Sequence, residues 1–363
     1  MTNTGYKAYT TLEQYNVYSG NATGVTKPNT VGDADYVAPV LDEVYCPIES
    51  TINWIAGGFY NSSEENVLKS TDGINWDYSR IPTLFDIYDI SFVNGEWFAV
   101  GASQDNVGGG FNNKVMRSFD TITWAEAVIP QISSVQSINY ANGIYVATGR
   151  ADSSGLNTIA TSVDGVNWTG RGIGGLDINS MGVTFANGIW VAYGESDAPD
   201  RGSLAYSTDA INWTPTFNYY YDKGFTFGYD AFYNGSYWIS TGLKGGSNTN
   251  VVGKSSDGIN WTPYSTGATV DNTGRRLGYF NNLWVLGGKG SFEIATSTNG
   301  QSWTGRLNQD LIDIRDFEYN DNKIISVGGK SESVGKIYSS TNATTWTELA
   351  QTRLGLYTIA IRK

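Results

Sequence analysis

The stretch Ser70-Thr71-Asp72-Gly73-Ile74-Asn75-Trp76 decides the fold of this chain, because variants of it occur seven times. Each copy has Ser, then Asp or Asn two residues later, then Trp four residues after that. Successive Trp residues lie 42 to 48 residues apart. A fixed period of roughly 40–50 residues predicts a propeller built from four-stranded blades. The acidic or amide residue and the Trp of the copies are Asp72, Asp120, Asp164, Asp209, Asp257, Asn299 and Asn342, and Trp76, Trp124, Trp168, Trp213, Trp261, Trp303 and Trp346.

A second sequence motif precedes most of these copies. In residues 90–101, an alternating apolar strand is followed by Asn94-Gly95, an aromatic strand and then Gly101. Asn-Gly between alternating strands predicts a tight hairpin, because both central residues must take positive φ. We expect Asp72-Gly73 to serve the same purpose in the second hairpin of a blade. One blade is therefore predicted to have strands at residues 87–93, 96–100, 114–118 and 122–128.

The two ends of the repeat region complement each other. The first copy lacks a first strand, and residues 355–362 form a strand with no blade of its own. Pairing this C-terminal strand with the N-terminal blade, about residues 51–79, would close the ring and remove free sheet edges. The sequence predicts an all-β, seven-bladed propeller at residues 51–363. Residues 1–50 do not follow the repeat and form a separate N-terminal arm.

Composition excludes several classes of function. The net charge of −12 repels nucleic acid and anionic membranes. No run of about 18 apolar residues is present, so no membrane insertion is expected. The chain has no His and one Cys, which removes the commonest general base and the commonest metal ligands. No phosphate-binding Gly loop or signal peptide is visible, and we expect no cofactor.

The Ser-x-Asp repeats resemble the Asp-box, or bacterial neuraminidase repeat, which in that family lies between the third and fourth strands of a propeller blade. The resemblance covers about residues 51–363. It implies the fold and leaves the function open, since Asp-box propellers include sialidases, other glycosidases, sorting receptors, photosystem assembly factors and phage proteins. Seven equivalent copies favour a structural brace over a metal or sugar site, because a site is normally unique.

An enzyme is the less favoured interpretation. A sialidase-like hydrolase would require three arginines, a Tyr–Glu nucleophile pair and an acid/base Asp, with the arginines and a carboxylate pair at the mouth of the channel. The motifs provide no such set. Glu195, Asp197 and Asp200 crowd one loop and could hold Ca²⁺, but an exposed acidic loop is the simpler interpretation, so no metal site is expected.

Binding is expected on the face with the long loops and around the central channel. Two loops are rich in aromatic residues, and flat rings beside Asn and Asp suit stacking on sugars or a protein interface. The candidate binding residues are Phe217, Tyr219, Tyr220, Tyr221 and Phe225, with Phe59, Tyr60 and Phe111.

These observations favour a non-enzymatic structural or host-binding protein of a virion, in a phage tail or capsid. Residues 1–50 would attach it to other virion proteins, and the propeller face would bind a host-surface glycan or protein. The missing signal peptide fits synthesis in a host cytoplasm. Two alternatives are a sialidase-like glycoside hydrolase and an intracellular assembly scaffold.

Overall fold

The structure is a computed structural model of the 363-residue chain. It describes residues 52–59, 65–103, 113–151, 154–195, 202–216, 225–244, 250–267, 270, 273–308, 312–320 and 322–363. Contacts divide the chain into two units, residues 1–50 and residues 51–363. The first unit lies outside the described residues. The described part of the second unit is all-β and contains 28 strands and no helix.

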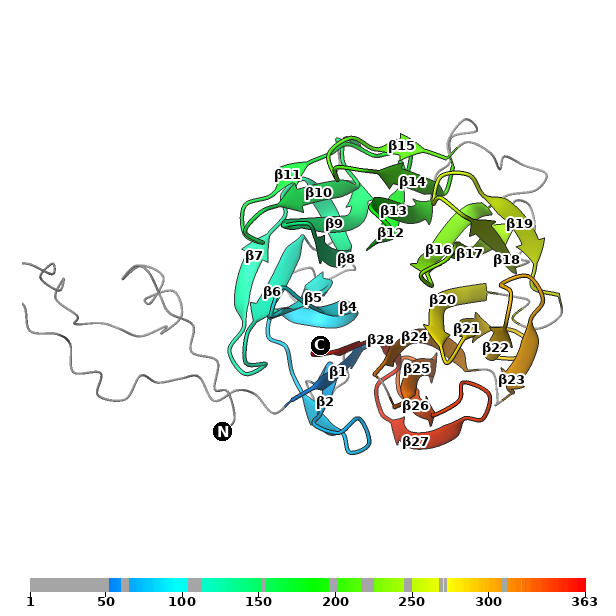
Figure 1. Cartoon of the computed structure of the whole chain (residues 1–363). Helices are drawn as coiled ribbons and strands as arrows, with labels where there is room; N and C mark the ends of the chain where they lie inside the picture. Colours follow the sequence, from blue (N-terminus) through cyan, green and yellow to red (C-terminus); the bar gives the residue numbers. More distant parts are fainter. Residues whose placement is uncertain are drawn as a thin grey trace, which may run out of the picture. The chain divides into compact units, whose positions relative to one another are not determined.

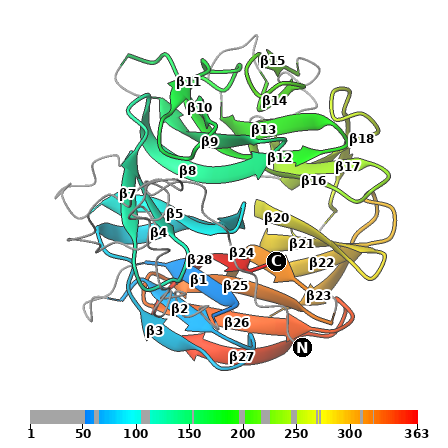
Figure 2. The ribbon, with the colours of Figure 1, turned by 60° about the vertical axis from the view of Figure 1, so that its left-hand side comes forward.

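The strands form successive four-stranded antiparallel groups (Figures 1 and 2). The first sheet has the order β28-β1-β2-β3. Its strands are β28 (Leu356–Ile361), β1 (Trp54–Gly58), β2 (Val67–Ser70) and β3 (Asp77–Ser79). The next three groups are β4 (Leu84–Val93), β5 (Glu96–Ser103), β6 (Lys114–Ser118) and β7 (Ala125–Val128); β8 (Ile132–Ala141), β9 (Ile144–Ala151), β10 (Ile159–Ser162) and β11 (Thr169–Gly170); and β12 (Asn179–Ala186), β13 (Ile189–Glu195), β14 (Leu204–Ser207) and β15 (Thr214–Pro215).

The last three groups follow the same pattern. They are β16 (Phe225–Tyr233), β17 (Trp238–Lys244), β18 (Asn250–Ser255) and β19 (Thr262–Ser265); β20 (Thr273–Phe280), β21 (Leu283–Lys289), β22 (Ile294–Ser297) and β23 (Thr304–Leu307); and β24 (Asp313–Tyr319), β25 (Ile324–Ser331), β26 (Val334–Ser340) and β27 (Thr347–Thr352). Single bridges, Asn179 to Arg150 and Glu195 to Phe227, join three of the groups into one twelve-stranded sheet. The arrangement is propeller-like, with the first strands of the groups toward a common centre (Figure 1).

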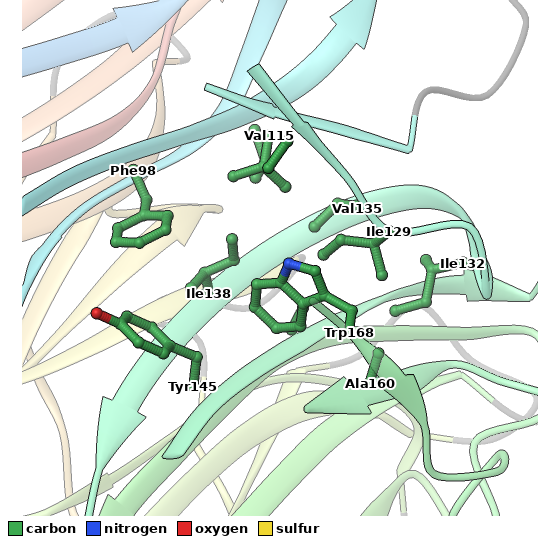
Figure 3. Close-up of a cluster of buried hydrophobic side chains, with 12 residues drawn as sticks. Phe98, Val115, Ile129, Ile132, Val135, Ile138, Tyr145, Ala160 and Trp168 are labelled. Carbon is green, nitrogen blue, oxygen red and sulfur yellow. The ribbon is translucent and has the colours of Figure 1, made fainter. Parts of the chain in front are cut away.

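The sheets pack face to face through apolar side chains. One cluster joins Phe98 and Val115, from β5 and β6, to Val135, Ile138 and other residues of the next sheet (Figure 3). Trp168 lies within this cluster and is only 7% exposed. The inner strands, such as β1 and β10, therefore bury residues on both faces, as stacked sheets require.

The tight turns between first and second strands match the expectation. Asn94 and Gly95 have φ of 52° and 79°, and Asn142–Gly143 and Asn187–Gly188 repeat this pattern. The second hairpin differs from the prediction. At Asp72–Gly73 only Gly73 has positive φ, because the turn is longer and is held by side chains.

The repeated motif forms this longer turn. Ser70 Oγ donates to Asp72 Oδ1 over 3.1 Å, and the same Oδ1 accepts the backbone N–H groups of Ile74 and Asn75 over 2.7 and 2.8 Å. The equivalent oxygen accepts two backbone N–H groups in the other six copies. These bonds hold the pKa of Asp72 well below its usual range. A side chain thus satisfies turn donors that no strand reaches.

The residue after this Asp or Asn takes a left-handed conformation, and in the second group that residue is Thr121, with φ of 65°. A β-branched residue is strained there by about 1–2 kcal/mol. We expect Thr121→Gly to raise the free energy of unfolding by up to about 1 kcal/mol, after the added freedom of the unfolded chain is subtracted. Urea unfolding measures the change.

The reverse substitution in the neighbouring group is the control. Gly73→Thr should destabilise, because Gly73 has a φ of 69° and a Cβ there would lie 3.1 Å from the Trp54 ring. An unchanged or lower stability of Thr121→Gly would show that the relief of strain does not exceed the loss of the buried Thr121 side chain.

Candidate functional site

Each first strand carries a β-bulge at the same place. In β4, Ile87 pairs with Gly101 and Asp89 pairs with Val100, so Tyr88 is the extra residue. A bulge turns its extra side chain out of the regular alternation. The extra residues of the seven strands are Tyr88, Gln136, Met181, Tyr229, Arg275, Arg315 and Tyr357.

All seven bulge residues line one cavity of about 270 Å³, which Asp89, Ser137 and Arg276 complete. The cavity is lined by residues of all seven first strands. These strands come together at the centre of the arrangement (Figure 1). The bulge is what sends one side chain from every group to the same place. We call this the axial cavity and regard it as the candidate site, since convergent polar groups in a concave pocket are typical of binding sites.

In six of the seven groups, a glycine near the end of the second strand makes room for the first strand close to its bulge. A Cβ on Gly101 would lie 1.8 Å from the carbonyl oxygen of Asp86, and one on Gly288 would lie 1.8 Å from that of Thr273. No residue other than glycine permits such an approach. The recurring glycine in the sequence therefore marks the bulge, although its meaning becomes clear only in the structure.

Two arginines at the cavity share one carboxylate. Arg275 Nε donates to both oxygens of Asp313 over 2.8 Å, and Arg315 Nη2 lies 3.2 Å from Asp313 Oδ2. Burial opposes the charge of Arg275, but Asp313 outweighs it and raises the pKa of that guanidinium. One Asp neutralises one of two cations, so this side of the cavity keeps a net positive charge available to an anion.

Tyrosines form the apolar part of the wall. Arg315 lies over the ring of Tyr357 at 4.3 Å and Arg275 lies over Tyr229 at 5.4 Å. The Tyr88 and Tyr357 rings meet edge to face, with centroids 6.1 Å apart. Burial raises the pKa of Tyr357 to about 12, and it also raises the pKa of Tyr88 and of Tyr229. Their hydroxyls therefore stay protonated near neutral pH and can donate hydrogen bonds.

A second layer of charged groups lies beneath the bulge residues. Arg276 Nε donates to Asp316 Oδ1 over 2.6 Å, and Asp230 Oδ1 lies 4.0 Å from Arg276 Nη1. Both carboxylates also bind the next four-stranded group along the chain. Asp230 accepts the N–H of Leu277, and Asp316 accepts the N–H of Ile359. These carboxylates link neighbouring sheets whose backbones are not otherwise paired there, so they have a structural role.

Asp89 completes this layer and faces the cavity. It accepts the N–H of Ile138, and its Oδ1 lies 3.3 Å from the hydroxyl of Thr358, which also lies 3.0 Å from Asp316 Oδ2. Thr358 has one hydroxyl proton, so a proton on Asp89 lets both contacts be hydrogen bonds. Burial disfavours the charged carboxylate and raises the pKa of Asp89 to about 6, in agreement with a protonated Asp89.

The raised pKa of Asp89 predicts a pH-dependent stability. The folded protein binds this proton up to about pH 6, whereas the unfolded chain releases it near its usual pKa of about 3.9. The contribution of Asp89 to the free energy of unfolding is therefore largest below about pH 4. It falls by on the order of 2 kcal/mol as the pH rises toward 6. Urea unfolding from pH 4 to 7 should show a smaller fall for Asp89→Asn than for the unmodified chain. Equal pH slopes would contradict the assignment.

The repeated motif lies elsewhere. Its residues occupy the turns between third and fourth strands, such as β2 and β3. They line neither the axial cavity nor a second cavity that adjoins it. Among the seven motif Trp residues, Trp168 and Trp261 are buried, and the other five are half-buried.

The aromatic residues selected from the sequence are only partly described. Phe59 lines a second cavity next to the axial one and packs on Tyr357 with ring centroids 4.4 Å apart. Phe225 begins β16, and its side chain is not among those described. The other candidates lie outside the described residues, and they are Tyr60, Phe111, Phe217, Tyr219, Tyr220 and Tyr221.

Metal binding finds no support in the described part of the chain. There, no group of three or more His, Cys, Asp or Glu is placed to hold an ion. Glu195 ends β13, while Asp197 and Asp200 lie outside the described residues. The described residues also include no helix with the length and apolar character needed to cross a membrane.

The residues of the axial cavity were missed by sequence analysis. Arg275, Arg315, Tyr88, Tyr229 and Tyr357 lie within the first strands of their groups, where alternation alone gives no reason to single them out. The recurring glycine opposite each bulge is the signal that could have found them.

Comparisons with known proteins give a likeness of fold only. No protein-family model and no curated protein matches the chain. A solved structure of the computationally designed Ika8 protein is similar with a TM-score of 0.50 and 12% identity, covering 86% of this chain and 91% of that one. A structure of a nidogen/laminin complex has a TM-score of 0.49 and 11% identity, covering 85% and 98%. The strand order itself makes the described part of the chain all-β and propeller-like.

Proposed function

We propose that residues 51–363 form a seven-bladed propeller closed by its own C-terminal strand. The pairing of β28 with β1, from Trp54 opposite Ile361 to Gly57 opposite Thr358, supports this. So do the contacts of the first strands, since β4, β8, β12, β16, β20, β24 and β28 contact one another in that order and β28 also contacts β4. Closure of this kind removes free edges.

We further propose that the propeller is a non-enzymatic binding protein that takes an acidic sugar in the axial cavity. The observation that carries this is the convergence of seven bulge residues, among them two arginines and three tyrosines, on one cavity. An arginine fork binds a carboxylate or sulfate through two hydrogen bonds. The tyrosine hydroxyls, which stay protonated near neutral pH, can donate hydrogen bonds to the oxygens of a sugar.

The acidic surface of the chain sharpens this selectivity. With a net charge of −12, the protein repels anions in general. Arg275 and Arg315 give the axial cavity a local positive charge that can attract one. A cleft with charge opposite to its surroundings attracts a matching ligand by focusing the field.

The wider role that we propose is that of a virion-associated structural or host-binding protein, in a phage tail or capsid. A host-surface glycan is a ligand that suits the axial cavity. Residues 1–50, which do not follow the repeat, would attach the protein to the particle. If residues 51–363 alone entered particles as well as the full chain, the proposed role of the arm would be wrong.

Calorimetry with acidic monosaccharides tests the binding function. We expect Arg315→Ala to weaken binding about 10–100-fold, because it removes a charge-assisted hydrogen bond and leaves Asp313 paired with Arg275. Lys336→Ala is the matched control, since it also removes one cation, and Lys336 pairs with Glu348 outside the cavity. An Arg315→Ala variant with unchanged affinity would overturn the proposal.

A second candidate function, glycoside hydrolysis of the sialidase type, is favoured by one observation. Arg275, Arg276 and Arg315 converge on the cavity beside Asp89, whose raised pKa suits a general acid. The carboxylates of the layer are, however, bound to arginines and backbone N–H groups. Turnover of a fluorogenic sialoside that is lost in Asp89→Asn would favour this function over simple binding.

A further inference from the structure

A second cavity of about 250 Å³ adjoins the axial cavity. Arg315 lines both cavities, and Asp313, which binds Arg315, lines the second. The second cavity is formed where β21, β24, β25 and β28 begin or end, with Lys289 and Lys330 at its border. The two spaces therefore meet at one guanidinium.

A row of aromatic rings runs from one cavity to the other. Tyr88 and Tyr357 line the axial cavity, and Phe59 lines the second. Tyr357 contacts Tyr88 at 6.1 Å and Phe59 at 4.4 Å between ring centroids. Adjoining rings of this kind give an apolar surface against which the C–H groups of successive sugar rings can pack.

The second cavity has its own cations. Lys289 and Lys330 are both exposed, and within the described residues neither ammonium group has an ion-pair or hydrogen-bond partner. Asp313 is already bound by Arg275 and Arg315. The cations of this cavity thus outnumber its carboxylates, Asp313 and Glu332, in a chain that is acidic overall.

We propose that the two cavities are subsites of one groove, which binds an oligosaccharide with acidic groups on neighbouring sugars. This rests on the proposed binding function of the axial cavity. The first acidic sugar lies against Arg275 and Arg315, and the second acidic group meets Lys289 and Lys330. The acidic group is a carboxylate or a sulfate, since both suit these cations.

Calorimetry on the full chain with galacturonic acid and digalacturonic acid separates the subsites. We expect the double variant Lys289→Ala/Lys330→Ala to weaken digalacturonic acid at least 10-fold and to leave galacturonic acid within 2-fold. Arg315→Ala should weaken both. A sulfated disaccharide tests the second form of the acidic group. The control is Lys114→Ala/Lys336→Ala, which also removes two lysines, each paired with a Glu on the outer strands.

Each result has one interpretation. If Arg315→Ala weakens both acids and the double lysine variant weakens neither, the second subsite is refuted and the proposed function stands. If Arg315→Ala has no effect, or if none of these acidic sugars binds at millimolar concentration, both proposals are wrong. If tetraglutamate binds as tightly as digalacturonic acid, the ligand is an acidic peptide and the sugar class is overturned. A circular dichroism spectrum equal to that of the unmodified chain confirms that each variant is folded.

Discussion

Replacing Asp316 by alanine is expected to lower the free energy of unfolding by about 3 kcal/mol, because it takes the close carboxylate partner from the half-buried Arg276 and leaves a buried backbone N–H without its acceptor. Asp316 is 3% exposed and binds Arg276 over 2.6 Å. It also accepts the Thr358 hydroxyl over 3.0 Å and the backbone N–H of Ile359 over 2.9 Å. One side chain thus links β24, β20 and β28, and urea unfolding measures its loss.

A double variant distinguishes the unpaired charge from the lost hydrogen bonds. Arg276→Met/Asp316→Ala removes both ions of this pair but also takes the nearby cation from Asp230, so it should recover only part of the loss seen in Asp316→Ala. Asp316→Asn still accepts backbone N–H groups, so its free energy of unfolding should lie between those of Asp316→Ala and the double variant. Should the double variant be no more stable than Asp316→Ala, the ion pair would not be the cause.

Replacing Trp97 by alanine is expected to cost about 3–5 kcal/mol, as large-to-small changes of fully buried aromatic residues do. Trp97 is 0% exposed in β5 and packs among Ile55, Val67 and Met116. Its ring contacts Phe92 with centroids 5.0 Å apart. Since Trp97 Nε1 has no hydrogen-bond partner among the residues that the structure describes, the loss comes from packing.

Trp124, the motif Trp of the same group, is the matched control. It is half-buried, and its Nε1 donates to the carbonyl oxygen of Thr121 over 3.3 Å. We expect Trp124→Ala to cost clearly less than Trp97→Ala in thermal or urea unfolding. Equal losses would mean that the repeated Trp contributes as much to the core as the buried one, contrary to the exposures.

Most strands of a group could be predicted from the repeat. The expected strand at residues 114–118 coincides with β6, and those at 87–93 and 96–100 lie within β4 and β5. The expected fourth strand at 122–128 is too long, since β7 begins at Ala125. Asp120 binds the N–H groups of Ile122 and Thr123 in the preceding turn, so these residues have no strand partner. The prediction assumes a turn of two residues, and it does not include the hydrogen bonds from the backbone to the Asp120 side chain.

The axial cavity could not be predicted in the same way. Tyr88, Arg275 and Tyr357 belong to strands far apart in the chain, and alternation assigns each of them to a sheet face. A bulge shifts the register by one residue and turns these side chains out of that pattern. The position of a bulge depends on how two strands meet, which local sequence indicates only through the glycine opposite.

The sequence by itself determined the repeat of four strands, the Asn-Gly hairpins and the complementary chain ends, because these depend on periodicity and on turn residues with positive φ. Only the tertiary structure decided which residues meet at the centre. Arg275, Arg315 and Tyr357 come together because separate sheets pack side by side and each first strand is bulged at the same level. Such contacts join residues that are distant in the chain, and their positions follow from packing rather than from local pattern.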